Sequence, residues 1–152
     1  MAEKEIKKEE KMEKLVLDLR RVARVVAGGK RFKFRATLVV GNRNGKVGVG
    51  IGKGLDVAEA IDKAERDAEK KLFTIPLREN RTIPHEVEAK YSAARVRIKP
   101  ARAGHGLIAG GAARVVLELG GVKDISCKIL SHTKNKLTTA LATVKALKKL
   151  KG

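Results

Sequence analysis

The sequence predicts an α+β protein made of two small domains, each of which combines a sheet with helices. In both halves of the chain, segments with the alternating pattern of strands are followed by segments with the spacing of helices. Between the halves lies TIPLRENRTIP, where Pro76 and Pro84 bracket a polar stretch that neither a helix nor a central strand accepts readily. We therefore expect a charged tail at residues 1–14, a first domain at 15–80 and a second at 81–152.

The first domain is expected to begin with two strands joined by a glycine turn. Residues 15–26 carry apolar residues among arginines and run into Gly28 and Gly29, which is typical of a strand that enters a turn. Basic and apolar side chains alternate in the next segment, KRFKFRATLVV, so one face should be cationic and the other should face the core. The cationic positions are Arg31, Lys33 and Arg35, and the apolar ones are Phe32, Phe34 and Ala36.

A third strand and a helix are expected to complete this domain. The segment NRNG at residues 42–45 predicts a hairpin turn, because Asn and Gly tolerate positive φ. Asp56 is expected to cap a helix. Apolar residues recur in that helix at spacings of three and four and predict its buried stripe: Val57, Ile61, Ala64, Ala68 and Leu72. Its acidic residues are expected to form solvated pairs with lysines one turn away.

The second domain is expected to mix strands with two helices. Residues 87–91, 95–99 and 125–130 predict strands. Between them, GHGLIAGGAARVVLELGG predicts a glycine-rich lead into a helix that Gly120 and Gly121 end. The last helix should start near Thr133 or Asn135. We expect its buried stripe to be Leu137, Leu141, Val144 and Leu147, and its C-terminal end carries Lys145, Lys148, Lys149 and Lys151.

The charge balance indicates a polyanionic partner. Thirty-five Lys and Arg against 17 Asp and Glu give a net charge of +18, which favours nucleic acid or an acidic membrane surface. The tail holds lysine and glutamate in equal numbers, so we do not expect it to bind, and its composition predicts disorder or a solvated helix. No apolar run approaches the ~18 residues of a membrane span, and no signal peptide is evident, so we expect a cytoplasmic protein without a membrane partner.

Two clusters of basic residues are expected to bind RNA, with a solvated surface as the alternative for each. In the first cluster, at residues 20–35, every charged residue is a cation, and such density calls for a counter-charge. Its members are Arg20, Arg21, Arg24, Lys30, Arg31, Lys33 and Arg35. The second cluster is Arg95, Arg97, Lys99 and Arg102, and we add Lys46, Lys53 and His105 as further candidates. Because Phe32, Phe34 and Phe73 fit core positions, we expect contacts to the backbone and shape of RNA rather than base stacking.

The stretch VGVGIGKGLD carries glycine at every second position: Gly48, Gly50, Gly52 and Gly54. The P-loop fingerprint fails because Gly52 and Lys53 are followed by glycine rather than Ser or Thr, and the dinucleotide fingerprint lacks its third glycine. In a strand these glycines form one bare face. That face admits either close packing of another element or a phosphate chain, and we expect close packing within a thin sheet that faces RNA.

We expect no enzyme activity, cofactor, metal or small-molecule substrate. His85, His105 and His132 lie about twenty or more residues apart and lack the spacing of metal ligands. No serine lies in a nucleophile-elbow pattern. Cys127, the only cysteine, is expected to be a buried apolar residue.

Several blocks of the chain resemble the bacterial ribosomal protein S-five family of the small subunit. The blocks are FRATLVVGNRNGKVGVGIGKGLDVAEAIDKAERDA, TIPH, RVRIKPA, GLIAGGAARVVLELGGVKDI and NKLTTALATVKAL, which follow one another within residues 15–150. The resemblance implies a first domain similar to double-stranded-RNA-binding domains. It also implies a second domain with a mixed sheet, two helices and a left-handed crossover.

The resemblance further implies a function in the cytoplasmic ribosome. It implies binding to small-subunit ribosomal RNA, contacts with ribosomal proteins S-four and S-eight, and a place near the channel where messenger RNA enters, with an effect on accuracy. The family's hairpin near the spectinomycin site corresponds to RRVARVVAGGK, in which Val22, Ala23 and Arg24 occupy the sensitive positions. The alternatives left open are a free RNA chaperone or non-ribosomal duplex-RNA binder, and a nucleotide-dependent enzyme.

Overall fold

The computed structural model describes residues 12–150 and contains two sheets and three helices within that range. The predicted tail at 1–14 lies almost entirely outside the described residues. In chain order the elements are β1 (Glu13–Val26), β2 (Gly29–Gly41), β3 (Lys46–Gly54), α2 (Val57–Lys70), β4 (Phe73–Thr74), β5 (Val87–Tyr91), β6 (Ala94–Pro100), β7 (Leu107–Ile108), α3 (Gly111–Leu119), β8 (Ile125–Ile129) and α4 (Lys136–Lys148).

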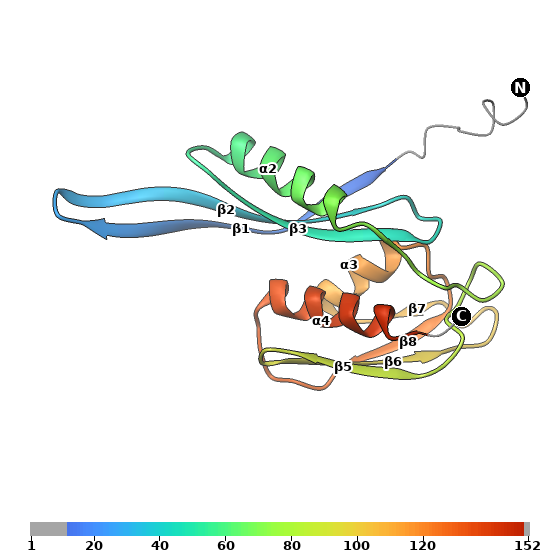
Figure 1. Cartoon of the computed structure of the whole chain (residues 1–152). Helices are drawn as coiled ribbons and strands as arrows, with labels where there is room; N and C mark the ends of the chain where they lie inside the picture. The colour runs from blue at the N-terminus through green and yellow to red at the C-terminus, as the bar shows by residue number, and fades with distance from the viewer. Residues whose placement is uncertain (1–11, 151–152) are drawn as a thin grey trace, which may run out of the picture.

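The first sheet is antiparallel, with strand order β1-β2-β3-β4. The β1–β2 ladder runs from Glu13 opposite Gly41 to Val26 opposite Gly29. Since β3 pairs with β2 only as far out as Phe34, the rest of this hairpin continues without a third strand. Figure 1 shows it as a long projection from the body of the molecule, and we call residues 20–35 the arm.

Helices cover both faces of the first sheet (Figure 1). On one face, Ala60, Ala64 and Ala68 of α2 are fully buried in a cluster with Leu38 and Val40 of β2. On the opposite face, apolar residues of β1, β2 and β3 share a core with α3 and α4, and its members include Leu17, Val39, Val47, Val49, Leu117 and Leu147. The core on this face is therefore common to both halves of the chain.

The second sheet has strand order β5-β6-β8-β7. The pairs β5–β6 and β6–β8 are antiparallel, whereas β7 is parallel to β8 and is connected to it through α3. Val96 and Ile98 of β6 are fully buried under the helices, and the alternating Arg95, Arg97 and Lys99 are exposed. The chain passes from one sheet to the other between Thr74 and Val87, and the division at residue 80 stays a prediction.

The α+β class with a sheet and helices in each half is confirmed. The predicted strands and helices are present with ends shifted by a few residues, and Asp56 caps α2 by accepting a 2.7 Å hydrogen bond from Glu59 N. Asn135 caps α4 in the same way. The two-residue strands β4 and β7 were not predicted, because such short segments carry no periodicity.

Several predicted core positions are wrong. Phe32 is 45% exposed, because it lies on the arm beyond the reach of the helices. Val57 is also exposed, and the buried residues of α2 are the predicted Ala64 and Ala68 together with Ala60. In α4, Leu137 and Leu141 are only half-buried, while Ala140, Thr143 and Ala146 are buried beside the predicted Val144 and Leu147. Cys127 is buried, as predicted, and desolvation raises the pKa of its thiol to about 11.

Candidate nucleic-acid interface

The glycine stripe of β3 lies directly under α2. A Cβ atom built on Gly50 would stand 2.3 Å from Ala68 N and 2.4 Å from Ala64 O, and one on Gly52 would stand 2.3 Å from Ala64 N. Real Cβ contacts are never this short, so the stripe allows the helix to approach the strand closely. Gly48 and Gly54 meet α2 in the same manner. Since the helix covers the bare face, the glycines are closely packed, as expected, and this face is not open to a phosphate chain.

The register of the arm gathers basic side chains on the other face of the sheet. In the β1–β2 ladder Arg24 lies opposite Arg31, and Arg20 lies opposite Arg35, which in turn pairs with Lys53 of β3. Directly paired residues and residues two apart along a strand share a face. We call this set the cationic face, and its members are Arg20, Arg24, Arg31, Lys33, Arg35 and Lys53.

The remaining basic residues of the first cluster lie on the α2 side of the arm. Lys30 is opposite Val25, and Arg21 is opposite Phe34. The guanidinium of Arg21 lies 3.9 Å from the centre of the Phe32 ring, in a cation–π contact. Sequence alternation alone does not place Arg21 with Phe32, because the contact crosses from one strand to the other.

The charge of the cationic face is almost uncompensated within residues 12–150. Arg20 pairs with Asp18, which lies just before the cluster, at 2.7 Å. The other members form no ion pair with the described acidic residues. Like charges directly opposite each other destabilise a ladder, so a bound polyanion would relieve this arrangement.

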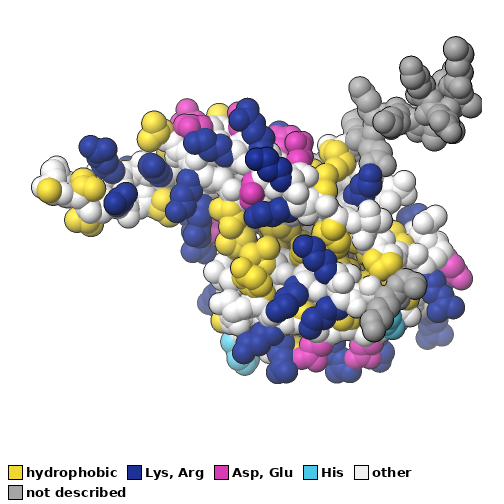
Figure 2. Space-filling model, viewed as in Figure 1, with side chains coloured by type: hydrophobic (Ala, Val, Ile, Leu, Met, Phe, Trp, Pro, Cys, Tyr) yellow, Lys and Arg dark blue, Asp and Glu magenta, His cyan; other side chains and the backbone are white. Residues whose placement is uncertain are grey.

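A hollow of about 370 Å³ lies on this face. Its lining is Val22, Ala23, Arg24, Val26, Arg31, Lys33 and Lys53. The lining includes Val22, Ala23 and Arg24, for which the resemblance to the family predicts a place in the spectinomycin-site hairpin. Figure 2 shows the Lys and Arg side chains distributed along the arm, with apolar side chains at its tip.

The second basic cluster is more nearly neutral than the first. Arg95 Nε lies 2.6 Å from Glu88 Oε1, and Arg97 contacts the carboxylate of Glu86. The outer face of the second sheet is therefore a mixed-charge surface, and RNA binding by this cluster stays a prediction. Alternation within β6 does not reveal these acids, because Glu88 lies on the neighbouring strand β5 and Glu86 lies just before it.

The further candidates occupy different places. Lys53 lies on the cationic face, whereas Lys46 is half-buried at the other end of β3. Lys99, Arg102 and His105 lie around a hollow of about 470 Å³ at the end of β6. The structure thus brings these three together, apart from the arm.

Two partly buried residues of this region escaped the sequence reasoning. Arg81 and Asp124 form an ion pair behind the loop that carries Arg102 and His105. They are 43 residues apart and belong to no short motif, so nothing in the sequence points to them. The described residues contain no group of His, Cys, Asp or Glu suited to hold a metal, and no helix among them is long and apolar enough to cross a membrane.

Comparison with known families agrees with the resemblance found in the sequence. The model of the ribosomal protein S5 N-terminal domain matches residues 12–76, and that of the ribosomal protein S5 C-terminal domain matches residues 89–152. The two matches together cover most of the chain. The first contains the strands of the first sheet, and the second contains nearly all of the second sheet.

Curated proteins are similar over nearly the whole chain. The small ribosomal subunit protein uS5 of Thermotoga neapolitana is 48% identical over 141 residues, which are 93% of this chain and 78% of that protein. The protein of the same name from Campylobacter jejuni is 48% identical over 143 residues, 94% of this chain and 96% of that protein. The uS5c protein of Cyanidium caldarium is 49% identical over 135 residues, 89% of this chain and 80% of that protein. The chain therefore belongs to the ribosomal protein S5 family.

Proposed function

We propose that this protein is a structural constituent of the small ribosomal subunit, and that it binds small-subunit ribosomal RNA through the cationic face of its arm. The family is one of non-enzymatic ribosomal proteins, and the relatives are named as proteins of the small subunit. The observation that carries the RNA-binding proposal is the ladder register, which sets Arg24 against Arg31 beside Lys33, with no ion pair from these three to a described acidic residue.

The composition of the arm favours contacts to phosphate over contacts to bases. Residues 20–35 consist of basic, apolar and glycine residues only, so the arm has no Asn, Gln, Ser or Thr side chain that could read a base edge. Guanidinium groups match phosphate oxygens in a bidentate geometry. We therefore infer recognition of the RNA backbone and its shape.

The finer parts of the proposal rest on the family resemblance. We place the protein in the cytoplasmic ribosome, next to ribosomal proteins S-four and S-eight and near the channel where messenger RNA enters, with roles in assembly and accuracy. The hairpin residues Val22, Ala23 and Arg24 line the hollow on the cationic face, which supports a role for this hairpin in contact with RNA. We also retain 15–80 and 81–152 as the two domains.

Sedimentation of a native lysate tests the proposal. The tagged full-length chain is expressed, the lysate is separated on a sucrose gradient at dissociating magnesium concentration, and the chain is quantified in each fraction. We expect it in the small-subunit peak in amounts comparable with other small-subunit proteins. A chain that stays at the top of the gradient, and that binds unrelated RNA duplexes as tightly as small-subunit RNA, would overturn the proposal in favour of a free duplex-RNA binder.

A further inference from the structure

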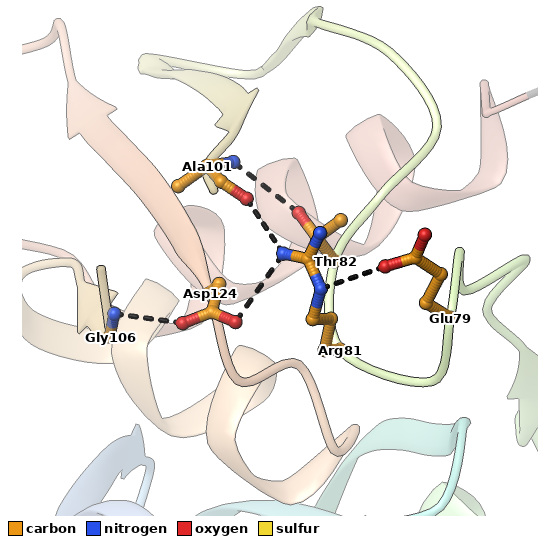
Figure 3. A network of polar contacts seen from close by, with 6 residues as sticks. All are labelled: Glu79, Arg81, Thr82, Ala101, Gly106 and Asp124. Atoms are coloured by element: carbon orange, nitrogen blue, oxygen red, sulfur yellow. Dashed lines mark hydrogen bonds and ion pairs between the residues drawn. The ribbon is translucent and has the colours of Figure 1, made fainter. Parts of the chain in front are cut away.

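A polar network outside the arm joins segments that are far apart in the sequence (Figure 3). Arg81 Nη1 donates to Ala101 O at 3.1 Å and lies 3.5 Å from Asp124 Oδ2. The other carboxylate oxygen of Asp124 accepts a 2.9 Å hydrogen bond from Gly106 N, and Thr82 Oγ1 accepts from Ala101 N at 3.4 Å. The network therefore holds both ends of the loop at residues 101–106.

Main-chain hydrogen bonds fix the network itself. Arg81 O accepts from Lys123 N at 2.8 Å and from Asp124 N at 2.9 Å, and Gly106 O accepts from Ile125 N at 3.1 Å. The side chains of Arg81 and Asp124 are 26% and 10% exposed. A pair this far buried is screened by salt less than a surface pair, so it can hold the loop at physiological ionic strength.

The loop presents two basic side chains at the ends of a single tight turn. His105 N donates to Arg102 O at 3.1 Å, and Gly104 between them has φ +86°, as the third position of a type II turn requires. Arg102 and His105 are exposed and line the 470 Å³ hollow together with Lys99 and Ser126. Among the described residues no carboxylate lines this hollow, and both oxygens of Asp124 are engaged in the network.

We propose that this hollow is a preformed site for a backbone phosphate of RNA, that Arg102 and His105 contact the phosphate, and that Arg81 and Asp124 position the loop that carries them. The proposal rests on the proposed function, because the phosphate belongs to ribosomal RNA. A loop held in one conformation loses less entropy on binding than a free loop, and this is the physical role of the Arg81–Asp124 pair. Unlike Arg95 and Arg97, neither Arg102 nor His105 has an acidic partner among the described residues.

Directed cleavage of RNA tests the positioning role. Ala103 is exposed in the turn, and the only native cysteine is buried with a raised pKa, so an iron chelate attached to an Ala103→Cys variant labels the loop selectively. The probe is a full-length small-subunit ribosomal RNA transcript. The labelled chain should cleave the RNA within a narrow set of nucleotides. The same chain with Arg81→Met and Asp124→Ala has an unchanged net charge, and it should give diffuse cleavage with an affinity about three- to tenfold lower, the size of a modest ordering cost.

A charge-neutral change elsewhere provides the matched control. Lys14→Met with Glu65→Ala removes an ion pair between β1 and α2 that lies outside the network, and it should leave cleavage and affinity as they are. A folded Arg81→Met/Asp124→Ala chain with the parent's cleavage pattern and affinity would overturn the positioning role. The double variant Arg102→Gln/His105→Gln removes the contacting groups and alters exposed side chains only, so it should bind the transcript more weakly. Unchanged affinity of this variant would overturn the proposed phosphate site. If the parent chain itself does not bind the transcript, it is the proposed function that fails.

Discussion

Arg24 and Arg31 lie directly opposite each other in the β1–β2 ladder, and neither forms an ion pair with a described acidic residue. Repulsion between them weakens the free arm, and a bound phosphate would remove it. We therefore expect the arm to be less stable in the free protein than in the complex with RNA.

Replacement of Arg31 by Glu should change stability and binding in opposite directions. An opposite-charge pair across the ladder is worth roughly 0.2–1 kcal/mol relative to a neutral one, so the amide protons of residues 22–33 should exchange more slowly in the Arg31→Glu chain. Its affinity for small-subunit RNA should nevertheless fall. Arg31→Gln is the control, with intermediate exchange. Faster exchange in the Glu variant than in the Gln variant would contradict the like-charge repulsion.

The close approach of α2 predicts that Gly50 tolerates no side chain. The Cβ of a Gly50→Ala variant would stand 2.3 Å from Ala68 N, so the helix must move away from the sheet. We expect the free energy of unfolding to fall by about 1–3 kcal/mol, the usual cost of overpacking, and Gly50→Val to be worse. Chemical denaturation measures this. Gly28→Ala, where a Cβ meets nothing within 4 Å, should have little effect, and equal stability of both variants would refute the packing role.

The core shared by the two halves of the chain predicts that they unfold together. The turn after β2 joins the end of α3, since Arg43 N donates to Leu119 O at 2.8 Å and a Cβ on Gly41 would stand 2.3 Å from that same oxygen. Tyr91 in β5 is the only tyrosine and the chain has no tryptophan, so its fluorescence reports on the second sheet.

The transition followed by Tyr91 fluorescence should coincide with the one followed by circular dichroism. Gly41→Ala should lower the free energy of unfolding by about 1–3 kcal/mol. The midpoints of both transitions should fall by the same amount. Two separate transitions in the parent protein would show that the halves fold independently despite the common core.

Asp67 predicts an acid-dependent contribution to stability. Desolvation raises the pKa of its carboxyl, but the hydrogen bonds from Ile51 N at 3.0 Å and from Lys71 outweigh it, and the pKa is lowered from its ordinary value of 3.8. The folded state then binds this proton less readily than the unfolded state, so the contribution is present above the unfolded pKa and is lost as pH falls through the lower folded pKa.

The comparison of the parent with Asp67→Asn isolates this effect. Asparagine can still accept from Ile51 N but does not titrate, so the parent should lose more stability than the variant as pH falls below about 4. Urea denaturation at a series of pH values measures the difference. Parallel curves for the two proteins would mean that the link between α2 and β3 through Asp67 does not depend on its charge.

The elements and the basic arm followed from the sequence, because strand alternation, helical spacing and cap residues are local signals. Phe32 was misplaced since alternation reports which residues share a face and not whether the strand has left the core. Similarly, hydrophobicity places Val57 in the buried stripe of α2. The glycines of β3 bring the helix so close to the strand that the small alanines form the contact instead of Val57.

Residues that depend on long-range pairing could not be predicted. Asp67 and Glu59 form the expected pairs with Lys71 and Lys63 one turn along α2. Beyond these pairs, Glu65 contacts Lys14 of β1 at 2.8 Å, and Asp67 also accepts a hydrogen bond from the backbone of β3. Arg81 and Asp124 meet only because two loops converge at the ends of strands of the second sheet. Such contacts depend on the tertiary structure, and the residue spacing within one segment does not predict them.

The salt dependence of RNA binding tests the central claim that the cationic face binds ribosomal phosphates. Each phosphate contact contributes roughly −0.7 to −0.9 to the slope of log affinity against log salt concentration. A chain with Arg24→Gln, Arg31→Gln and Lys33→Gln should bind a small-subunit RNA transcript more weakly, with a slope about 2 to 3 smaller in magnitude and an unchanged circular dichroism spectrum. The matched control, Lys63→Gln, Arg66→Gln and Lys70→Gln, loses the same charge from the exposed surface of α2 and should keep nearly the parent slope. If the arm variant retains the slope and affinity of the parent protein, the RNA does not bind the cationic face.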